Sequence, residues 1–358
     1  MASAASSSTR KTTPSRTERE TTPATIPIIT LHDVARAAGV SHTTVSWALR
    51  GDPRIKPSTR EKVLAAAQAL GYVPNEVARC LVKGCTNTIA IVSHTFSSAF
   101  ESETLRGIEL EVSESHPCFT LAQYSASGSA ERAQTLYEQL LRGNKADAVI
   151  SLADPPSPAI HAAYVKAKKP LVVFDEDAIG MDMIHGDSAL GAKLATELLL
   201  DRGCRRPGII SSQTQENGRL KCNPGRVSTF FKLCAERGVA AQQRSIHEFR
   251  FESGQALAAS IVAEAWDGVF CAAGDMVAIG IMAGCRALGV RIPEDLRVVG
   301  YDDLLVSSMV QPALTTIAQP LETMGREAVR LCFNAPAEER YTPVSRCFTP
   351  RLVQRDSA

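Results

Sequence analysis

The chain has 358 residues, of which 44% are hydrophobic and 22% charged, a composition typical of a globular protein with a sizeable interior. This length exceeds one typical domain and suits a small module joined to a two-lobed core. No stretch reaches the ~18 consecutive apolar residues of a membrane-spanning helix. Residues 1–27 are rich in Ser, Thr, Pro and Arg without an apolar segment, so we expect a disordered tail rather than a secretory signal, and a cytoplasmic protein.

The chain contains ten cysteines and seven histidines, but the cysteines form no C-x-x-C pair. Neither residue type shows the spacing of zinc ligands. The sequence therefore predicts no metal and no cofactor, and cysteines that stay reduced.

The net charge of +1 conceals an asymmetry between the two parts of the chain. Residues 1–86 hold 12 Lys and Arg against 6 Asp and Glu, whereas residues 87–358 hold 27 against 32. A basic amino-terminal part on an acidic remainder is typical of a nucleic-acid-binding protein. A basic terminus that is merely solvated would give the same charge balance.

Two short helices are predicted at the start of the ordered sequence. Thr30 and Asp33 have the spacing of a capping box, and Gly39 ends the helix that follows. Ser41 caps a second helix that runs to Ala48. The short, glycine-containing connection between the two is the helix-turn-helix arrangement.

A third helix is predicted between Pro57 and Gly71, where Val63, Ala67 and Leu70 would complete a small core. Short polar side chains at the amino terminus of the second helix can enter the major groove of DNA, although an ordinary solvated helix has the same pattern. The outward residues of that helix are His42, Thr43, Ser46 and Trp47, with Arg50 just beyond.

Residues 31–81 resemble the head of the lactose-repressor/galactose-repressor (LacI/GalR) family of transcriptional regulators. The shared motifs are D-V-A-x-x-A-G-V-S, T-V-S, T-R-x-K-V and G-Y-x-P-N-x-x-A-R-x-L, all in register. The resemblance implies that His42 and Thr43 contact bases in the major groove, and it assigns phosphate contacts to Ser41, Thr44, Ser46 and Asn75. The DNA-binding residues expected on this basis are Leu31, Ser41, His42, Thr43, Thr44, Ser46, Trp47, Arg50, Tyr72, Asn75, Ala78, Arg79 and Leu81.

Residues 74–87 are the expected hinge helix and linker. Asn75 is a good N-cap, but an isolated helix as short as residues 76–81 is unstable in water. The resemblance implies that this helix folds only on the operator, paired with its mate from a second subunit, and that Leu81 wedges into the minor groove. A linker leucine that packs on the body is the alternative interpretation of Leu81.

Two positions of the recognition helix depart from the family pattern. Trp47 stands where many members carry a base-contacting Arg, and indole has one donor, so it cannot form the bidentate contact of Arg to guanine. Arg50 stands where Asn is common and adds a charge suited to a phosphate contact. The operator architecture therefore carries over but the base preference does not, and Trp47 is either a DNA contact or a core or interface residue.

From residue 88 short apolar strands alternate with amphipathic helices such as 131–142 and 190–202, which predicts a parallel α/β core. Strands are expected at residues 88–93, 119–124, 146–152, 170–175, 207–211, 268–272 and 298–301. Ligands of such folds bind at the carboxyl ends of the strands, where Asp175, Asp275 and Asp302 follow apolar runs.

A catalytic interpretation of this core finds little support. Gly274, Gly280 and Gly284 do not form G-x-G-x-x-G after a strand, and neither a P-loop nor a G-x-S-x-G elbow occurs. No nucleophile or base constellation accompanies the strand-end aspartates, which suit hydrogen bonds to ligand hydroxyls equally well. We therefore predict that the protein is not an enzyme.

The LacI/GalR resemblance continues through the body, in residues 96–109, 292–304 and 314–328. It implies the periplasmic-binding-protein type I fold, an α/β effector domain of two Rossmann-like lobes, behind a small all-α helix-turn-helix head. The expected boundaries are a tail at 1–27, a head at 28–73, the hinge at 74–87 and an effector-binding and dimerisation domain at 88–358. Lobe 1 would comprise about 88–186 and 319–345, and lobe 2 about 187–318 and 346–358.

The resemblance also implies an effector site. By register, Arg226 grips effector hydroxyls or a carboxylate, and Asp302 is the acceptor opposite it. A surface salt bridge is the alternative for Arg226, and a contact that only caps the lobe is the alternative for Asp175. Gly274 replaces a common Asn and Thr229 a common Gly, which weakens any identification of the ligand. The effector-binding residues expected are Phe96, Phe100, Asp175, Arg226, Phe249, Asp275 and Asp302.

Together these features predict a sequence-specific DNA-binding transcriptional regulator. We expect a repressor that binds a pseudo-palindromic operator as a homodimer, because one recognition helix per subunit requires two half-sites. A small-molecule effector, a sugar or sugar derivative, would bind between the lobes and control the affinity for DNA. A soluble sugar-binding protein without DNA binding and an activator of the same family are the alternatives.

Overall fold

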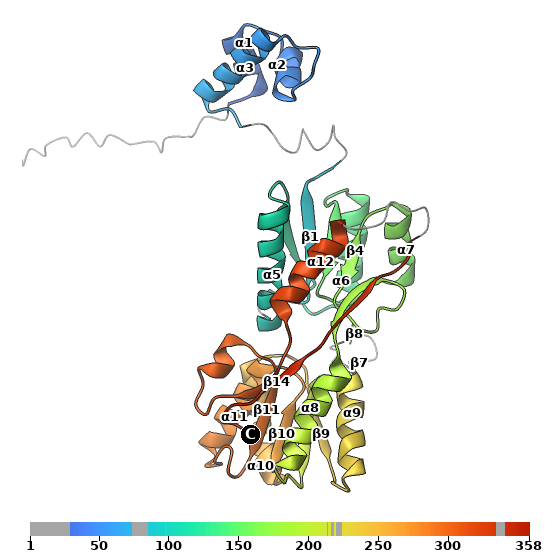
Figure 1. Ribbon diagram of the computed structural model, residues 1–358, viewed down its shortest axis with the longest axis vertical. Coiled ribbons are helices and arrows are strands. Elements are labelled where there is room, and N and C mark those ends of the chain that lie inside the picture. Colours follow the sequence, from blue (N-terminus) through green and yellow to red (C-terminus); the bar gives the residue numbers. More distant parts are fainter. Residues whose placement is uncertain are drawn as a thin grey trace, which may run out of the picture. The chain divides into compact units, whose positions relative to one another are not determined.

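The computed structural model describes residues 29–73, 85–96, 98–212, 214–215, 218–219, 224–333 and 341–358. The chain forms two compact units divided after Arg79, here called the head and the body (Figure 1). The expected tail and most of the expected hinge, including Asn75, Ala78, Arg79 and Leu81, lie outside the described residues.

The head consists of α1 (Leu31–Ala38), α2 (His42–Leu49) and α3 (Pro57–Leu70), so its three predicted helices are confirmed. The Asp33 carboxylate accepts hydrogen bonds from the Thr30 amide at 2.9 Å and the Thr30 hydroxyl at 2.6 Å, which fixes the start of α1. Gly39 and Gly71 end α1 and α3 in the left-handed conformation that glycine adopts without steric cost. The core between the helices is made of Val34, Ala35, Ala38, Val45, Ala48, Val63 and Ala67.

The first lobe of the body is a parallel sheet in the order β13-β5-β4-β3-β1-β2. Alternate residues of β1 enter two different cores, because successive side chains of a strand point to opposite faces. Ile89 and Ile91 pack beneath α5 and α12, whereas Ala90 and Val92 pack beneath α6 and α7. The elements are β1 (Thr88–Ser93), α5 (Ala99–Ser115), β2 (Thr120–Ser125), α6 (Ala130–Arg142), β3 (Ala148–Ser151), α7 (Pro158–Lys166), β4 (Leu171–Val173), β5 (Asp182–Gly186), α12 (Leu321–Phe333) and β13 (Ser345–Phe348).

The second lobe is a sheet in the order β14-β12-β11-β10-β6-β9, parallel except for β14, which runs antiparallel to β12. Helices α10 and α11 cover one face, and α8 and α9 cover the other. The elements are α8 (Ser188–Asp201), β6 (Pro207–Ser212), the hairpin β7 (Thr214–Gln215) and β8 (Gly218–Arg219), α9 (Pro224–Glu236), β9 (Gln242–Ile246), α10 (Phe251–Ala263), β10 (Gly268–Cys271), α11 (Asp275–Ala287), β11 (Arg297–Asp302), a 3-10 turn (Leu305–Ser308), β12 (Thr315–Ala318) and β14 (Arg351–Val353). Among the described helices of head and body, none has both the length and the apolar character needed to cross a bilayer.

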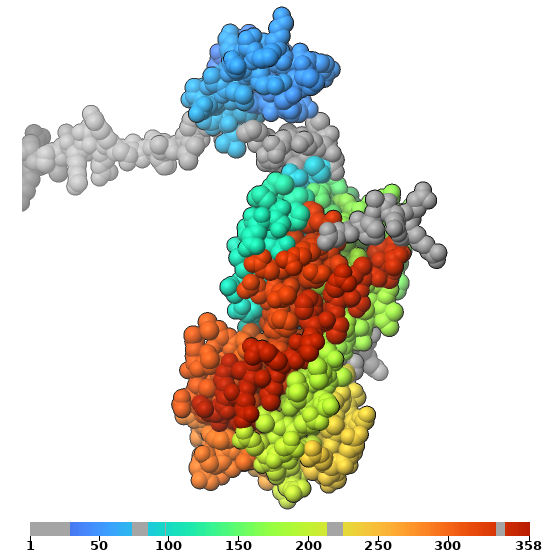
Figure 2. Space-filling view, in the orientation of Figure 1, coloured from blue at the N-terminus to red at the C-terminus, as the bar shows by residue number. Residues whose placement is uncertain are grey.

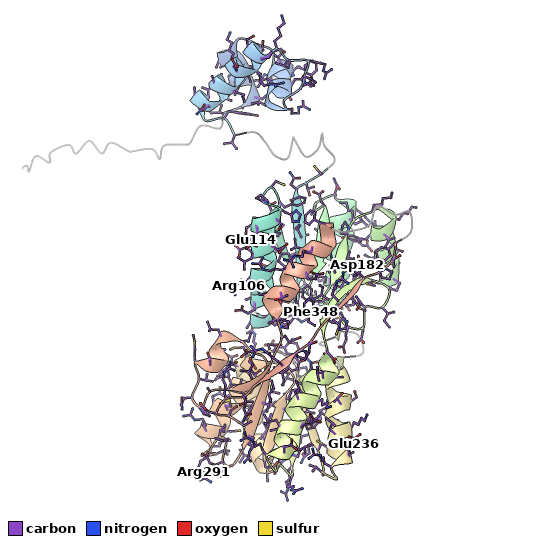
Figure 3. The ribbon with its side chains drawn as sticks, in the orientation of Figure 1. Arg106, Glu114, Asp182, Glu236, Arg291 and Phe348 are labelled. Atoms are coloured by element: carbon purple, nitrogen blue, oxygen red, sulfur yellow. The ribbon has the colours of Figure 1, made fainter. Side chains whose placement is uncertain are left out.

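The described chain passes between the two sheets after β5, after β12 and after β13. Figure 3 places Phe348, the last residue of β13, between the lobes, and Figure 2 shows the carboxy-terminal segments, in red, lying along one face of both lobes. We had expected the last crossing at about residue 345. The structure places it after Phe348, because residues 345–348 pair with β5 along their whole length.

Helices α5 and α12 of the first lobe are in very close contact. They cross at Gly107 and Gly325, where the backbone of each helix touches the backbone of the other. Ion pairs flank the crossing on the surface, from Arg326 to Glu114 at 2.8 Å and from Arg106 to Glu322 at 2.9 Å (Arg106 and Glu114 are labelled in Figure 3). The close approach itself depends on the two glycines, because a Cβ at either position would overlap the backbone of the other helix.

Gly107→Ala should lower the free energy of unfolding of the body by about 3 kcal/mol, because a Cβ at this position would overlap the carbonyl group of Glu322. Thermal melts followed by circular dichroism would measure the loss. Glu109→Ala, on the exposed side of the same helix, is the control and should change stability by less than about 0.5 kcal/mol. A Gly107→Ala protein as stable as the wild type would show that the two helices can separate without cost.

Candidate functional site: the recognition surface and the interlobe pocket

The amino terminus of α2 presents the polar surface expected of a recognition helix. The Ser41 hydroxyl accepts a hydrogen bond from the Thr44 amide at 3.1 Å and so caps the helix. His42 and Thr43, in the first turn, are exposed. The His42 ring lies 5.3 Å from the ring of His32, which follows the first residue of α1. The two side chains predicted to contact bases are therefore accessible on the surface of the head.

Trp47 is half-buried by a contact within the head. The guanidinium carbon of Arg54 lies 4.5 Å from the centroid of the Trp47 ring. Arg54 is itself held by Asp52, with its two nitrogens 2.9 and 2.7 Å from the two carboxylate oxygens. These hydrogen bonds lower the pKa of Asp52 to about 2. Trp47 thus has a partner within the head, a cation over its face, and because Arg54 is largely exposed this contact lies at the surface of the head.

Of the remaining predicted DNA contacts in the described part of the head, Thr44 has its hydroxyl 2.9 Å from the Ser41 hydroxyl, and the others fall into two groups. Arg50 folds back along α2, where its Nε donates to the Ser46 carbonyl at 3.0 Å and its terminal nitrogen donates to the Ser46 hydroxyl. An Arg50 contact to phosphate therefore requires its side chain to swing away from Ser46. Leu31 and Tyr72 are half-buried and pack against the core of the head, so their side chains have a structural role there.

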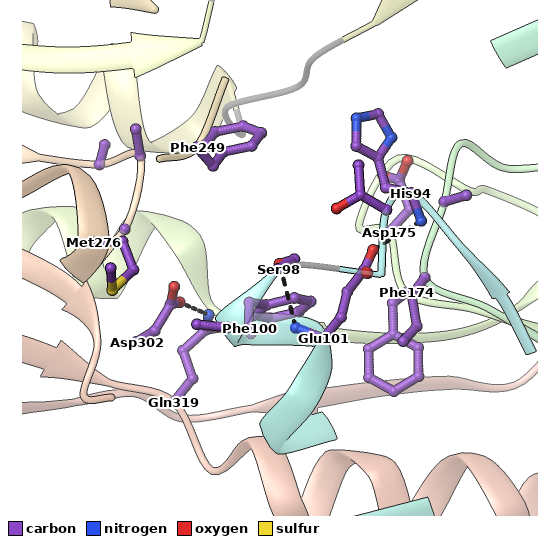
Figure 4. Close-up of a pocket in the computed structure, with 18 of the residues that line it drawn as sticks. His94, Ser98, Phe100, Glu101, Phe174, Asp175, Phe249, Met276, Asp302 and Gln319 are labelled. Carbon is purple, nitrogen blue, oxygen red and sulfur yellow. Dashed lines mark hydrogen bonds between the residues drawn. The ribbon is translucent and has the colours of Figure 1, made fainter. Parts of the chain in front are cut away.

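In the body, the carboxyl ends of the strands of both lobes enclose a cavity of about 570 Å³ (Figure 4). Parallel strands end at the same edge of a sheet, and the loops after them gather polar side chains at that edge. Of the predicted effector residues, six line the cavity: Phe100, Asp175, Arg226, Phe249, Asp275 and Asp302. Phe96 does not, and its side chain is 62% exposed, so its prediction is wrong: the loop between β1 and α5 turns this ring to solvent.

Arg226, in the first turn of α9, faces the pocket. Its guanidinium carbon lies 3.6 Å from the centroid of the Tyr301 ring, and one terminal nitrogen donates to the Ala272 carbonyl at 2.8 Å. Both contacts are to residues at the carboxyl ends of neighbouring strands, β11 and β10. The guanidinium is thus oriented on the pocket wall, which disfavours the alternative of a surface salt bridge.

Asp302 is the last residue of β11 and has a strained backbone. Its φ of 108° is rare for a residue with a side chain, and such strain gathers at functional sites. The side-chain amide of Gln319 donates through Nε2 to one Asp302 oxygen at 2.8 Å, as the dashed line in Figure 4 shows. Burial, and to a lesser extent the nearby Asp275 carboxylate, raise the pKa of Asp302 to about 7 against the opposing effects of the Arg226 charge and the Gln319 hydrogen bond.

Asp275 borders the same cavity but its carboxylate serves the fold. The side chain is fully buried, and it accepts hydrogen bonds from the Leu304 amide at 2.8 Å, the Ser307 hydroxyl at 2.7 Å and the Thr316 hydroxyl at 2.6 Å. Burial raises its pKa to about 6 although these hydrogen bonds act to lower it. The Asp275 carboxylate thus joins α11 to the 304–307 turn and to β12, and its complete burial indicates a structural role.

Glu101, in the first turn of α5, was not predicted as a site residue. Its side chain is only 3% exposed and lines the cavity, and Oε1 accepts the His94 amide at 2.8 Å. Burial raises the pKa of Glu101 to about 7, and the hydrogen bond from the His94 amide offsets only part of the rise. Ser98 caps α5, with the Glu101 amide 3.4 Å from its hydroxyl. The S-x-x-E spacing of Ser98 and Glu101 was visible in the sequence, but this spacing predicts a helix cap and not a pocket residue.

The pocket is rich in carboxylates. Its described lining contains Glu101, Asp154, Asp175, Glu176, Asp177, Glu248, Asp275 and Asp302. Against these stand two arginines, Arg226 and Arg250, and three histidines, His94, His185 and His247. Arg250 lies 3.5 Å from Glu248, with which it pairs. In the parts of the chain that the structure describes, no three His, Cys, Asp or Glu side chains are grouped to hold a metal ion.

A helix-turn-helix head with an exposed recognition helix, joined to a two-lobed α/β body with a pocket between its lobes, defines the class of helix-turn-helix DNA-binding proteins with an α/β body. Residues 30–75 match the family of bacterial regulatory proteins, lacI family, and residues 196–358 match the periplasmic binding protein-like domain. The chain is 32% identical to the HTH-type transcriptional regulator CelR of Thermobifida fusca, over 92% of this chain and 98% of CelR. It is 30% identical to the HTH-type transcriptional repressor PurR of Vibrio vulnificus (strain CMCP6), over 92% of this chain and 98% of PurR.

Solved structures agree with these relationships. The CelR–cellobiose complex superimposes with a TM-score of 0.63 at 28% identity, over 92% of this chain and 100% of that one. The lac repressor dimer bound to operator and the anti-inducer ONPF has a TM-score of 0.76 at 24% identity, over 92% and 99%. The chain belongs to the LacI family of bacterial transcriptional regulators. The predicted fold class, and the prediction of a regulator and not an enzyme, are confirmed.

The buried Glu101 carboxyl should make the stability of the ligand-free body depend on pH. Its pKa is about 7 in the folded protein and near 4.5 when unfolded, so its stabilising contribution is complete below pH 4.5 and is lost as pH rises through 7. Glu101→Gln removes this loss. Its melting temperature relative to the wild type should therefore rise from pH 5 to pH 8, by the equivalent of at most about 3 kcal/mol.

Differential scanning fluorimetry across this pH range would measure the effect, with Glu109→Gln on the exposed side of α5 as the control. The control should keep a constant offset from the wild type. If Glu101→Gln shows the same constant offset, the Glu101 carboxyl does not titrate near neutrality.

Proposed function

We propose that this protein is a repressor that binds a pseudo-palindromic operator as a homodimer and responds to a small sugar in the interlobe pocket. The observation that supports this proposal most is the joint presence, in one chain, of an exposed recognition helix and a polar pocket of small-molecule size. A volume of about 570 Å³ lies within the range of pockets that enclose small ligands.

The DNA contacts are inferred from the first turn of α2. His42 and Thr43 are exposed there, and their side chains are short enough to follow the edges of bases in the major groove. The excess of Lys and Arg in residues 1–86 supplies attraction to phosphates. The proposal also includes the hinge residues, with Leu81 as a minor-groove wedge. For the hinge, the support is the similarity of its sequence to the family pattern.

A dimer follows from the geometry of DNA. One α2 helix reads one half-site, and two half-sites one helical turn apart require two heads. The lac repressor structure to which this chain is similar is described as a dimer bound to operator. We infer the same assembly here, with the bodies in contact and the hinge helices paired on the duplex.

The effector is inferred from the pocket wall. Phe100 from lobe 1 and Phe249 from lobe 2 offer apolar faces, while Arg226 and Asp302 offer a donor and an acceptor on one side. Rings that carry hydroxyl groups suit this combination of flat and polar surfaces. The similar CelR structure contains cellobiose, and another structure of this family contains ribose.

The DNA part of the proposal can be tested on the recognition helix. His42→Ala and Thr43→Ala should each weaken binding to the preferred duplex by ~1–3 kcal/mol and relax the preference at the base pairs contacted. Selection from random duplexes, followed by titration at several salt concentrations, would measure both. Glu61→Gln, on an exposed position of α3, should leave the preference unchanged. A wild-type protein with no salt-sensitive affinity for any duplex would contradict the proposal.

The effector part can be tested at Arg226. Arg226→Lys should retain operator binding but weaken binding of the sugar by about 2 kcal/mol, roughly thirtyfold, because Lys cannot reproduce the planar donor pair of the guanidinium. A thermal-shift screen of sugars would find the ligand, and titration of the operator complex with it would measure the response. Arg237→Lys, whose side chain pairs with Asp201 on the surface, is the control. Equal responses of the two variants would exclude Arg226 from the effector site.

A further inference from the structure

Glu101 is an ionisable side chain that is buried at the wall of the pocket. It accepts the His94 amide through Oε1, while Oε2 has no hydrogen-bond partner among the described residues. Nor does any described Lys or Arg form an ion pair with it. A buried carboxyl oxygen without a partner costs free energy, which a ligand donor at this position would recover.

The titratable and charged groups that line the pocket with Glu101 are mostly carboxylates, with two arginines and three histidines among them. They include Asp154 after β3, Asp175 after β4, His185 on β5, Arg226 on α9, His247 after β9 and Asp302 on β11. Glu176, Asp177, and the Glu248–Arg250 pair lie beside these. Even without Glu101, Asp275 and Asp302, whose pKa values are raised to about 6 or 7, five carboxylates stand against two arginines around the pocket. A phosphate or carboxylate on the ligand would lose its hydration among them.

We propose that Glu101 is a specificity residue of the pocket, and that its ionised carboxylate accepts a hydroxyl or ammonium donor from a saccharide that carries no phosphate or carboxylate group. This inference rests on the proposed sugar-sensing function and narrows its ligand to neutral saccharides and amino sugars. Figure 4 shows Glu101 among the pocket side chains, with its carboxylate directed toward Asp175 and His94.

The proposal links ligand binding to the protonation of Glu101. In the free protein burial raises the pKa of Glu101 to about 7, so the ionised fraction increases about tenfold between pH 6 and pH 8. A ligand that binds only the ionised form gains apparent affinity in the same proportion. The pocket histidines and a ligand amine can titrate in this range as well. Comparison of the wild type with Glu101→Gln removes their contributions.

The experiment is isothermal titration of the full chain with cellobiose, glucosamine and glucose 6-phosphate at pH 6, 7 and 8. We expect cellobiose or glucosamine to bind and glucose 6-phosphate not to bind. The affinity for the better ligand should rise about tenfold more from pH 6 to pH 8 in the wild type than in Glu101→Gln. Glu109→Gln, exposed on the same helix, should behave as the wild type. The melting temperature of each variant shows whether it is folded.

Each other outcome decides against the proposal in a distinguishable way. Tighter binding of glucose 6-phosphate, or a pH dependence that Glu101→Gln shares with the wild type, would overturn the role of Glu101 and leave sugar sensing intact. Binding of none of the three saccharides would count against sugar sensing itself, and the assignment of Glu101, which depends on it, would fall with it.

Discussion

The carboxylate of Asp275 is fully buried, and the three donors that surround it come from the 304–307 turn and from β12. A Cβ at Gly300 would overlap this carboxylate, so only glycine fits at this position of β11. The next strand-end aspartate, Asp302, is left with a positive φ and a single described side-chain donor, Gln319. The hydrogen-bonded carboxylate of Asp275 thus holds the strand ends of the second lobe in place, and the carboxylate of Asp302 beside it lines the pocket.

The helices of the head and most elements of the second lobe could be predicted from the sequence, because the residues that define them lie close together in the chain. Thr30, Ser41 and the two C-terminal glycines define helix ends through hydrogen bonds that span only a few residues, and Pro57 starts α3 through its fixed backbone angle. Strands β1, β6, β10 and β11 are apolar on both faces, so their composition alone reveals them. Strands β9 and β13 carry polar residues and lie at sheet edges, where pairing and not hydrophobicity makes the strand.

The site was only partly accessible, because a strand-end carboxylate does not reveal whether its partners lie within the fold. Asp275 and Asp302 have the same sequence context, yet the donors that satisfy Asp275 come from residues 29 to 41 positions away. Glu101 has the spacing of a helix cap, but its carboxylate turns to the His94 amide and the pocket instead. Phe96 precedes a turn whose course no local pattern specifies. For Asp275, long-range hydrogen bonding decided the outcome, and local sequence does not report it.

The pocket and the interlobe crossings share residues, and this is what makes the body suited to sensing. Gln319, which holds Asp302, lies in the crossing between β12 and α12, and its side chain touches Gly186 at the end of β5, just before another crossing. A ligand that competes for Asp302 therefore acts on the segments that set the angle between the lobes. It can shift their equilibrium only by the difference between its affinities for the two arrangements. A switch of about 5 kcal/mol would need several such contacts at once, which a saccharide touching Glu101 on lobe 1 and Arg226 on lobe 2 could supply by bridging the lobes.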